Sequence, residues 1–322
     1  MSHQSKIVIL DGKTLNPGDN PWTPLEALGE ITVYDRTPHD QIVSRCHDAS
    51  IVLTNKVPFS QETLAQLPNL KLIAVTATGY NVVDIAAAND QGVVVSNVPE
   101  YSTDSVAQHV FAMLLSFLHQ PMEHNAAIAN GRWQEIGDFS FTLSPIQELA
   151  GKTMGIVGLG RIGRATAKVA NAFGMRVVAS SRTEKNPLPF DGFEWLPIDQ
   201  LFAESDVISL HLPQTDTNSQ FVNAALLGQM KPNGILINAA RGGLINEADL
   251  AQALNAGQIA GALLDVVSSE PIGLDNPLLQ AKNCIITPHI AWATLAARKR
   301  LLDATAENVR AFLSGNPTNI VS

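Results

Sequence analysis

Arg241, Glu270 and His289 each stand a few residues beyond a run of apolar residues in the second half of the chain. A guanidinium suits planar oxyanions, a carboxylate can orient an imidazole, and an imidazole exchanges protons near neutral pH. In open α/β sheets, ligands bind beyond the carboxyl ends of the strands. If the three runs are strands of one sheet, these side chains could converge on one site despite their separation in the sequence.

A glycine-rich turn is the second sign of chemistry. Gly158-Leu159-Gly160-Arg161-Ile162-Gly163 follows the apolar run Met154–Val157 and opens a helix-like segment at 161–173. In this context the first glycine permits a tight turn, the second lets the backbone approach a pyrophosphate, and the third lets the helix pack close to the strand. The helix N-terminus presents N–H donors to the phosphates. The alternative is a plain glycine-rich turn, but the context predicts a dinucleotide site.

The end of the next strand predicts which dinucleotide binds. An NAD site usually has Asp or Glu there, about 20 residues past the glycines, to hold the ribose 2′-hydroxyl. Here Ser181 stands at that position and Arg182 follows, with no acid before Glu184. The hydroxyls of Ser180 and Ser181 can donate hydrogen bonds and Arg182 can add charge, so NADP(H) is favoured and NAD(H) stays possible. In the alternative, Arg182 covers the adenine, and Glu184 or a water holds the ribose.

Two series of alternating β-rich and helix-like segments must position these residues. Such alternation indicates parallel sheets covered by helices. We therefore predict an α/β fold of two doubly wound parallel-sheet domains, with a Rossmann cofactor domain inserted in a flavodoxin-like substrate domain. The expected strands are 6–10, 31–34, 50–53, 71–75 and 93–96, then 154–157, 176–180, 207–210, 235–238, 262–267 and 284–287.

Long helices mark the expected domain boundaries. One is expected at 106–118 after the capping cluster Ser102–Ser105, and another at 292–313, ended by Gly315 and Pro317. We assign residues 1–102 and 292–322 to the substrate (catalytic) domain and residues 103–291 to the dinucleotide-binding domain. The aromatic segment Gly131–Leu149 is expected to be irregular. It is either a loop packed on its own domain or an arm that contacts another subunit.

Composition narrows the class of protein. The net charge of −9 argues against nucleic acid or an anionic membrane as the main partner. The two cysteines are far apart in sequence, so a disulfide framework is not expected, and no Cys or His cluster has metal-ligand spacing. The first residues contain no apolar signal region, and no apolar segment is long enough to span a bilayer. We expect a cytoplasmic protein without a metal.

The chain resembles the D-isomer-specific 2-hydroxyacid dehydrogenase family over essentially its full length. The glycine fingerprint, Arg241, Glu270 before proline and His289 after Thr-Pro follow the family's order and spacing. The runs Thr287–Thr294 and Ala77–Asn81 most resemble the glycerate dehydrogenase/hydroxypyruvate reductase branch. The resemblance implies an NAD(P)-dependent homodimer that reduces a small 2-keto acid, of the hydroxypyruvate or glyoxylate type, to the D-2-hydroxy acid.

The resemblance also implies catalytic roles. Arg241 should bind the substrate carboxylate and polarise the carbonyl, and His289 should protonate the carbonyl oxygen. Glu270 should orient the imidazole and favour its protonated form. The substrate should also meet backbone donors at Thr78, Gly79 and Tyr80, and a pocket shaped by Trp292.

Further family positions map onto the cofactor. His211 is expected to be a wall of the cofactor site rather than an acid–base group. Asp265 could hold the nicotinamide carboxamide, or it could be only a strand-end acid. The full expected set is Thr103, Gly158, Gly160, Arg161, Ile162, Gly163, Ser180, Ser181, Arg182, His211, Leu212, Pro213, Thr217, Ala239, Ala240 and Asp265.

Two alternatives remain at this point. The first is a dehydrogenase of another substrate, such as glyoxylate, 3-phosphoglycerate or formate. The chain ends soon after its last expected helix, without the regulatory domain of many phosphoglycerate enzymes, and Glu270 beside His289 does not suit a formate enzyme. The second alternative is a nucleotide-sensing corepressor that binds peptides. Intact Arg241, Glu270 and His289 favour turnover over that role.

Overall fold

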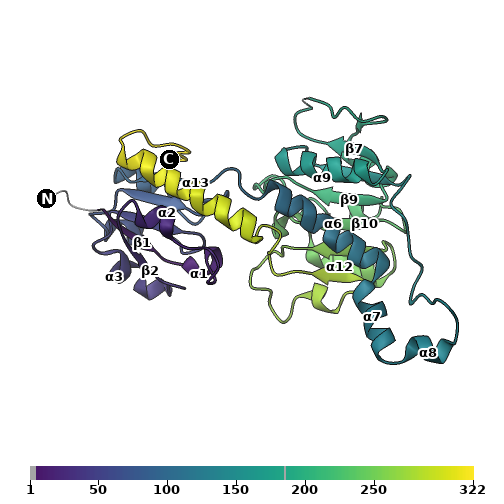
Figure 1. Ribbon diagram of the computed structural model, residues 1–322. Coiled ribbons are helices and arrows are strands. Elements are labelled where there is room, and N and C mark those ends of the chain that lie inside the picture. The colour runs from purple at the N-terminus through teal and green to yellow at the C-terminus, as the bar shows by residue number, and fades with distance from the viewer. Residues whose placement is uncertain (1–4, 185) are drawn as a thin grey trace. The chain divides into compact units, whose positions relative to one another are not determined.

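The computed structural model describes residues 5–184 and 186–322, so part of the N-terminal stretch expected to contain no signal region lies outside the description. The chain splits into two compact units. Unit 1 comprises Met1–Ser102 and Trp292–Ser322, and unit 2 is the continuous stretch Thr103–Ala291. Each unit contains its own sheet (Figure 1).

Unit 1 is built on a five-stranded parallel sheet in the order β2-β1-β3-β4-β5. Every residue of its central strands β3 and β4 is buried, because helices cover both faces. This strand order is the flavodoxin-like doubly wound order. The strands are β1 (Lys6–Ile9), β2 (Glu30–Val33), β3 (Ile51–Thr54), β4 (Leu72–Val75) and β5 (Val94–Ser96).

The last helix of the chain completes the core of unit 1. It begins at Leu295 rather than at the predicted residue 292, because the Thr294 hydroxyl accepts a hydrogen bond from the Ala297 N–H and caps the helix there. Its apolar face packs into the core through Leu301 and Val309. The helices of unit 1 are α1 (Gly12–Leu15), α2 (Thr23–Glu26), η1 (His39–Gln41), α3 (Ile42–Cys46), α4 (Gln61–Ala65), α5 (Ile85–Asp90) and α13 (Leu295–Leu313).

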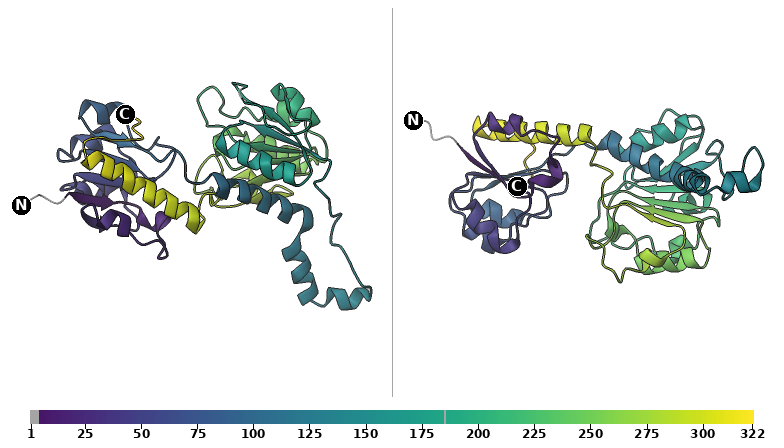
Figure 2. Two further views of the ribbon diagram at one scale, coloured as in Figure 1. Left: turned by 45° about the horizontal axis from the view of Figure 1, so that its top comes forward. Right: turned by 60° about the horizontal axis from the view of Figure 1, so that its bottom comes forward.

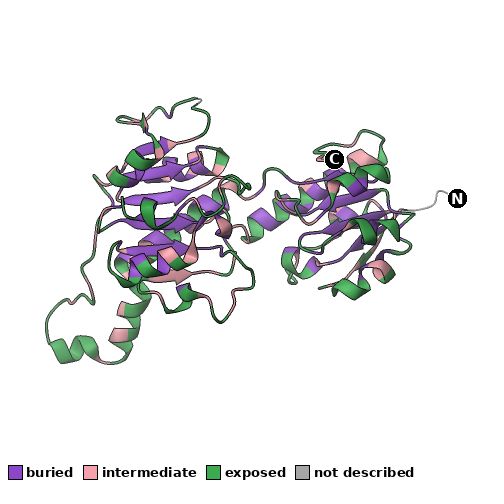
Figure 3. Cartoon of the chain, turned by 180° about the vertical axis from the view of Figure 1, so that it is seen from behind, coloured by how far each residue is buried: buried purple, intermediate pink, exposed green. Residues whose placement is uncertain are grey.

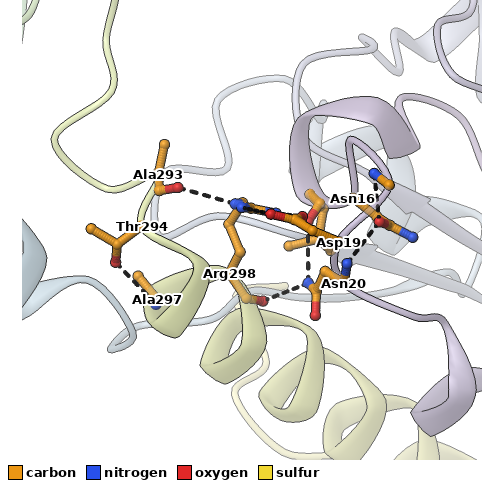
Figure 4. A network of polar contacts seen from close by, with 9 residues as sticks. Asn16, Asp19, Asn20, Ala293, Thr294, Ala297 and Arg298 are labelled. Carbon is orange, nitrogen blue, oxygen red and sulfur yellow. Dashed lines mark hydrogen bonds and ion pairs between the residues drawn. The ribbon is translucent and has the colours of Figure 1, made fainter.

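A polar network ties the first turn of α13 to the loop after α1 (Figure 4). The buried Arg298 guanidinium contacts both carboxylate oxygens of Asp19 and donates to the carbonyls of Leu15 and Ala293. The Asn20 amide donates to the Leu15 and Arg298 carbonyls. A buried guanidinium is costly without such partners, so this network is a specific feature of unit 1.

Unit 2 is built on a seven-stranded parallel sheet in the order β12-β11-β10-β9-β6-β7-β8. Because β6 has β9 on one side and β7 on the other, the strand order reverses at β6. This is the switch point of a Rossmann sheet, and the predicted fold class is confirmed. The strands are β6 (Thr153–Val157), β7 (Arg176–Ser180), β8 (Glu194–Trp195), β9 (Val207–Leu210), β10 (Ile235–Asn238), β11 (Gly261–Leu264) and β12 (Cys284–Ile286).

Separate apolar cores cover the two faces of this sheet. Its strands are largely buried, whereas the helices outside them are exposed on their outer sides (Figure 3). One core contains Leu250 and Leu254 of α12, and the other contains Val110 and Leu114 of α6. No helix among the described residues is long and apolar enough to cross a membrane. The helices of unit 2 are α6 (Thr103–His119), α7 (Pro121–Ala129), α8 (Arg132–Ile136), α9 (Arg161–Ala172), α10 (Ile198–Glu204), α11 (Ala224–Leu227), η2 (Gly242–Leu244), α12 (Glu247–Asn255) and η3 (Pro277–Gln280).

Residues 121–148, here called the arm, extend from the body of unit 2 (Figures 1 and 2). Neither α7 nor α8 has a buried residue, and Phe139 is 86% exposed. Contacts inside the arm shape it, including the Trp133 indole that donates to the Asp138 carbonyl. The prediction of a loop packed on its own domain is therefore wrong, and α8 is regular where an irregular segment was expected. The second interpretation, a subunit-contact arm, stays a prediction.

Candidate active site

Adjacent parallel strands deliver the three candidate catalytic residues to one edge of the unit 2 sheet. β10, β11 and β12 are neighbours in the sheet and run in the same direction. Arg241, Glu270 and His289 follow these strands in turn, so all three lie beyond the carboxyl ends. Ligands of open α/β sheets bind at this edge.

His289 and Glu270 form a direct pair. His289 Nδ1 lies 2.7 Å from Glu270 Oε2, and the two side chains are 31% and 32% exposed. The other oxygen, Glu270 Oε1, accepts the Val267 N–H at 3.3 Å. An ionised carboxylate only accepts hydrogen bonds, so the pair assigns the Nδ1 proton to face Glu270. This leaves His289 Nε2 as the nitrogen that can face a substrate.

A close backbone approach brings the Arg241 turn against the Glu270 loop. A Cβ on Gly242 would lie 1.9 Å from the Val267 carbonyl carbon, so only glycine fits there. The Asn238 amide holds the turn, because it accepts the Ala240 N–H and donates to the Arg241 carbonyl. Arg241 itself is exposed, and its Nη1 donates to the Ala240 carbonyl. Within the described residues its guanidinium forms no ion pair, so donors remain for an anionic ligand.

Asp265 fixes the backbone around His289. Its buried carboxylate accepts the N–H groups of Ile290 and Ala291 at 2.9 and 2.8 Å, and its carbonyl accepts the His289 N–H. Burial alone would raise the pKa of Asp265, but hydrogen bonds from His109, Thr287 and these amides outweigh it and hold the pKa below its ordinary value. The carboxylate is therefore ionised and engaged inside the protein. Its expected contact with the cofactor stays a prediction.

His289 has a left-handed backbone conformation, with φ of 54°. For a residue with a Cβ this costs roughly 1–2 kcal/mol. Such strain persists where the surroundings over-determine the conformation, and it gathers at functional sites. Here Asp265 supplies that constraint, because its carbonyl accepts the His289 N–H and its carboxylate accepts the next two N–H groups.

The glycine turn has the shape that a bound pyrophosphate requires. Gly158 has φ of 94°, and a Cβ there would lie 2.6 Å from the His211 carbonyl oxygen. A Cβ on Gly163 would lie 2.3 Å from the Gly158 carbonyl oxygen, so the third glycine sets the close packing of α9 on the turn. A Cβ on Gly160 would meet nothing within 4 Å. The space over Gly160 is thus open to a ligand at the N-terminus of α9, and the residues fit a dinucleotide.

The ribose-binding edge lies beside this turn. The Gly158 N–H donates to the Ser180 carbonyl at 2.8 Å, and β7 ends at Ser180. Ser181 and Arg182 are therefore the first residues past the strand, where the acid of an NAD site usually stands. Arg182 is exposed.

Comparison with known proteins decides the family. Residues 111–291, more than half of the chain, match the model described as "D-isomer specific 2-hydroxyacid dehydrogenase, NAD binding domain". The chain belongs to the D-isomer-specific 2-hydroxyacid dehydrogenase family. It is therefore an NAD(P)-dependent oxidoreductase, as the sequence predicts.

Two curated relatives support the predicted branch of the family. A hydroxypyruvate reductase of Blautia hydrogenotrophica is 48% identical over 98% of this chain and 99% of the relative. A glycerate dehydrogenase of Methylorubrum extorquens is 40% identical over 98% of both. Among solved structures, the NADPH-dependent glyoxylate/hydroxypyruvate reductase of Sinorhizobium meliloti, in complex with NADP and malonate, is 30% identical. It has a TM-score of 0.81 and covers 99% of this chain and 97% of that one.

Other predicted cofactor residues of this dehydrogenase line the same edge of unit 2. Burial lowers the pKa of the His211 imidazole to about 3, and its Nε2 lies 2.8 Å from Ser209 Oγ. His211 is thus neutral at physiological pH, which suits a wall rather than an acid–base group. Thr103 begins α6. The remaining predicted residues are Leu212, Pro213 and Thr217 after β9, Ala239 and Ala240 after β10, and Arg161 and Ile162 at the start of α9.

The predicted substrate residues of unit 1 follow its own sheet. Thr78, Gly79 and Tyr80 lie beyond the carboxyl end of β4, and the Thr78 and Tyr80 side chains are exposed. The Thr78 hydroxyl donates to the Val98 carbonyl, which fixes the loop. The Trp292 ring packs edge-on against Tyr101 with centroids 6.3 Å apart. Their roles toward substrate stay predictions.

The structure also reveals site residues that the sequence did not indicate. Gly242 and the Asn238 amide shape the Arg241 turn, and His109 reaches Asp265 from α6. The Asn-Ala-Ala-Arg-Gly-Gly run was a usable signal for the first two, whereas nothing local marks His109. Within the described ranges, no group of three or more His, Cys, Asp or Glu side chains could hold a metal ion.

Proposed function

We propose that this enzyme reduces a small 2-keto acid of the hydroxypyruvate or glyoxylate type to the D-2-hydroxy acid with NADPH. The observation that carries the proposal is the His289–Glu270 pair, 2.7 Å apart, beside the Arg241 turn at the carboxyl edge of a dinucleotide-binding sheet. Unit 2 binds the dinucleotide, and unit 1 carries the substrate loop at Thr78–Tyr80. The names of the curated relatives and of the Sinorhizobium enzyme support this substrate class.

The residues of unit 2 divide the work of the reaction. A nicotinamide held by unit 2 would supply the hydride for the keto carbon. The Arg241 guanidinium binds the substrate carboxylate through two donors and polarises the carbonyl. His289 Nε2–H donates its proton to the carbonyl oxygen as charge develops there. Glu270 accepts the Nδ1–H, stabilises the imidazolium and keeps Nε2 aimed at the substrate.

We propose that NADPH is preferred over NADH. Ser181 and Arg182 stand at the position where an acidic side chain would repel a 2′-phosphate. No Asp or Glu lies between the end of β7 at Ser180 and Glu184. A guanidinium with neighbouring hydroxyls is the usual recognition chemistry for that phosphate. The related Sinorhizobium reductase is NADPH-dependent, which supports the same preference.

Initial rates with two cofactors and several substrates test the proposal. NADPH and NADH oxidation is measured with hydroxypyruvate, glyoxylate and pyruvate in parallel. Fast NADPH oxidation with hydroxypyruvate or glyoxylate is the expected result. A preference for NADH would overturn the role of Ser181 and Arg182 and leave the reaction in place. Absence of turnover with every pair would contradict the proposed substrate class and favour the peptide-binding alternative.

We further propose that the protein is a cytoplasmic homodimer in which the arm contacts the second copy. The arm exposes several large apolar side chains, namely Met122, Trp133, Phe139, Leu143 and Ile146. Apolar side chains gathered on one exposed segment are typical of a protein–protein contact. Both cysteines are free, and burial raises the pKa of each thiol to about 12. Inert packing thiols of this kind suit a reducing compartment.

A further inference from the structure

A histidine of α6, His109, joins the network around Asp265. His109 Nε2 lies 3.0 Å from Thr287 Oγ1 and 3.4 Å from Asp265 Oδ1, and its side chain is 18% exposed. Thr287 Oγ1 lies 2.6 Å from the same Asp265 oxygen. Three polar side chains therefore form one cluster: His109 from α6, Asp265 after β11 and Thr287 after β12.

The proton positions in this network follow from the ionised state of Asp265. An ionised carboxylate only accepts, so the single hydroxyl hydrogen of Thr287 points to Asp265 Oδ1. The Met113 sulfur, 3.7 Å from Thr287 Oγ1, is a longer and weaker acceptor. The Thr287 oxygen can then only accept from His109. His109 thus carries a hydrogen on Nε2, and that N–H faces both the hydroxyl and the carboxylate.

The same carboxylate holds the strained proton donor. Asp265 Oδ1 also accepts the Ile290 N–H, and Oδ2 accepts the Ala291 N–H, directly after His289. If Asp265 lost its side-chain donors, a buried charge would lack part of its hydrogen bonding, which is unfavourable. The carboxylate would move toward other partners, and the left-handed conformation of His289 would lose its constraint.

We propose that His109 and Thr287 are positioning residues for the proton donor. They hold the Asp265 carboxylate, and that carboxylate holds His289 in its left-handed conformation with the imidazole toward Glu270. The effect on turnover rests on the proposed function. The effect on the backbone at 289–291 does not, because it follows from the hydrogen bonds alone.

Paired substitutions separate the donor function from bulk packing. His109→Leu and Thr287→Val remove the donors and keep similar volume. His109→Gln and Thr287→Ser retain an N–H or O–H that can reach Asp265. All variants are compared in the full-length protein, and Thr287→Val is the decisive variant if His109→Leu fails to fold.

The kinetic test measures kcat, KM and the NADPH Kd with hydroxypyruvate. Removal of a donor should lower kcat at least about tenfold, because small misplacements of a reacting group are costly. KM and the NADPH Kd should stay within about threefold, and the donor-retaining variants should recover much of the kcat. In a His289→Ala background, His109→Leu should cause no further loss, because both changes act on one step. An additive loss there, or unchanged kcat in both donor-free variants, would overturn the proposal.

Hydrogen exchange of the Ile290 and Ala291 amides gives a readout that needs no turnover. Exchange should be faster in Thr287→Val and His109→Leu than in the wild type, and nearly normal in Thr287→Ser and His109→Gln. If no 2-keto acid is reduced but exchange changes in this pattern, the proposed function fails and the positioning role of His109 and Thr287 stands. Unchanged exchange in the donor-free variants would refute this positioning role, whatever the activity.

Discussion

At the scale of single residues, His289 carries the most specific prediction. His289→Ala should lower kcat for 2-keto acid reduction by roughly 10²–10⁴-fold, the usual contribution of a general acid. The NADPH Kd, measured by fluorescence titration, should be nearly unchanged. His39→Ala, at an exposed histidine of unit 1, is the matched control. Near-normal turnover of His289→Ala would remove this residue from the mechanism.

Glu270 makes a prediction about turnover. Its carboxylate accepts the Nδ1–H of His289 in a charge-assisted hydrogen bond that keeps Nε2 toward the substrate. Glu270→Leu leaves Nδ1 without this acceptor, so kcat for 2-keto acid reduction should fall at least about tenfold, whereas the NADPH Kd should be nearly unchanged. Glu270→Gln keeps an amide oxygen that can accept the Nδ1–H and should retain more of the kcat. Steady-state kinetics measure both variants, and a wild-type kcat in Glu270→Leu would contradict the pairing in the working enzyme.

At this scale the sequence indicated residue types but not their surroundings. Arg241, Glu270 and His289 were predicted from their residue types after apolar runs and from the family resemblance. Strand order then explains how they share one edge. His109 was not predicted, since it acts from the middle of a helix whose local pattern only reports packing. The hydrogen bonds that the Asp265 carboxylate accepts could not be predicted either, because tertiary contacts bring its partners together.

At the scale of elements, the Arg298 network makes unit 1 sensitive to acid. The Arg298 hydrogen bond lowers the pKa of Asp19 below its ordinary value of 3.8. A depressed carboxyl pKa contributes stability above the ordinary value, and this contribution is lost as the pH falls through the lowered value. Asp19→Asn should therefore lower Tm at neutral pH, and the difference from the wild type should shrink below about pH 4. Thermal unfolding followed across pH checks this.

Asp40→Asn, at an exposed carboxylate elsewhere in unit 1, serves as the control for that experiment. A Tm difference for Asp19→Asn that does not change with pH would argue that charge pairing with Arg298 is not its cause.

Regular elements were predictable where periodicity was strong. The long apolar strands and the helices near 106–118 and 161–173 were predicted within a few residues. β8 and α3 were not, because two to five residues carry no period of their own. The start of the last helix was misplaced by three residues, since the Thr294 cap outweighs the apolar pattern before it.

At the scale of the whole molecule, the arm predicts the oligomeric state. Phe139→Asp combined with Met122→Asp should convert the proposed dimer to a monomer, because two charges would be buried in the contact. Sedimentation velocity measures the change. Leu274→Asp is the matched control, since Leu274 is 98% exposed but lies outside the arm. A wild type that sediments as a monomer would reject the proposal.

The division of unit 1 in the sequence has a consequence for how the chain is made. Its sheet is complete by Ser96, but its core also needs the apolar face of α13, synthesised almost two hundred residues later. Unit 2 is continuous, so it can fold while the ribosome is still translating α13, and domains generally fold as units. The N-terminal strands must therefore wait, with part of one face of their sheet uncovered, until α13 has been synthesised. During that interval the nascent protein presents apolar surface to chaperones, and slow translation before α13 would lengthen the exposure.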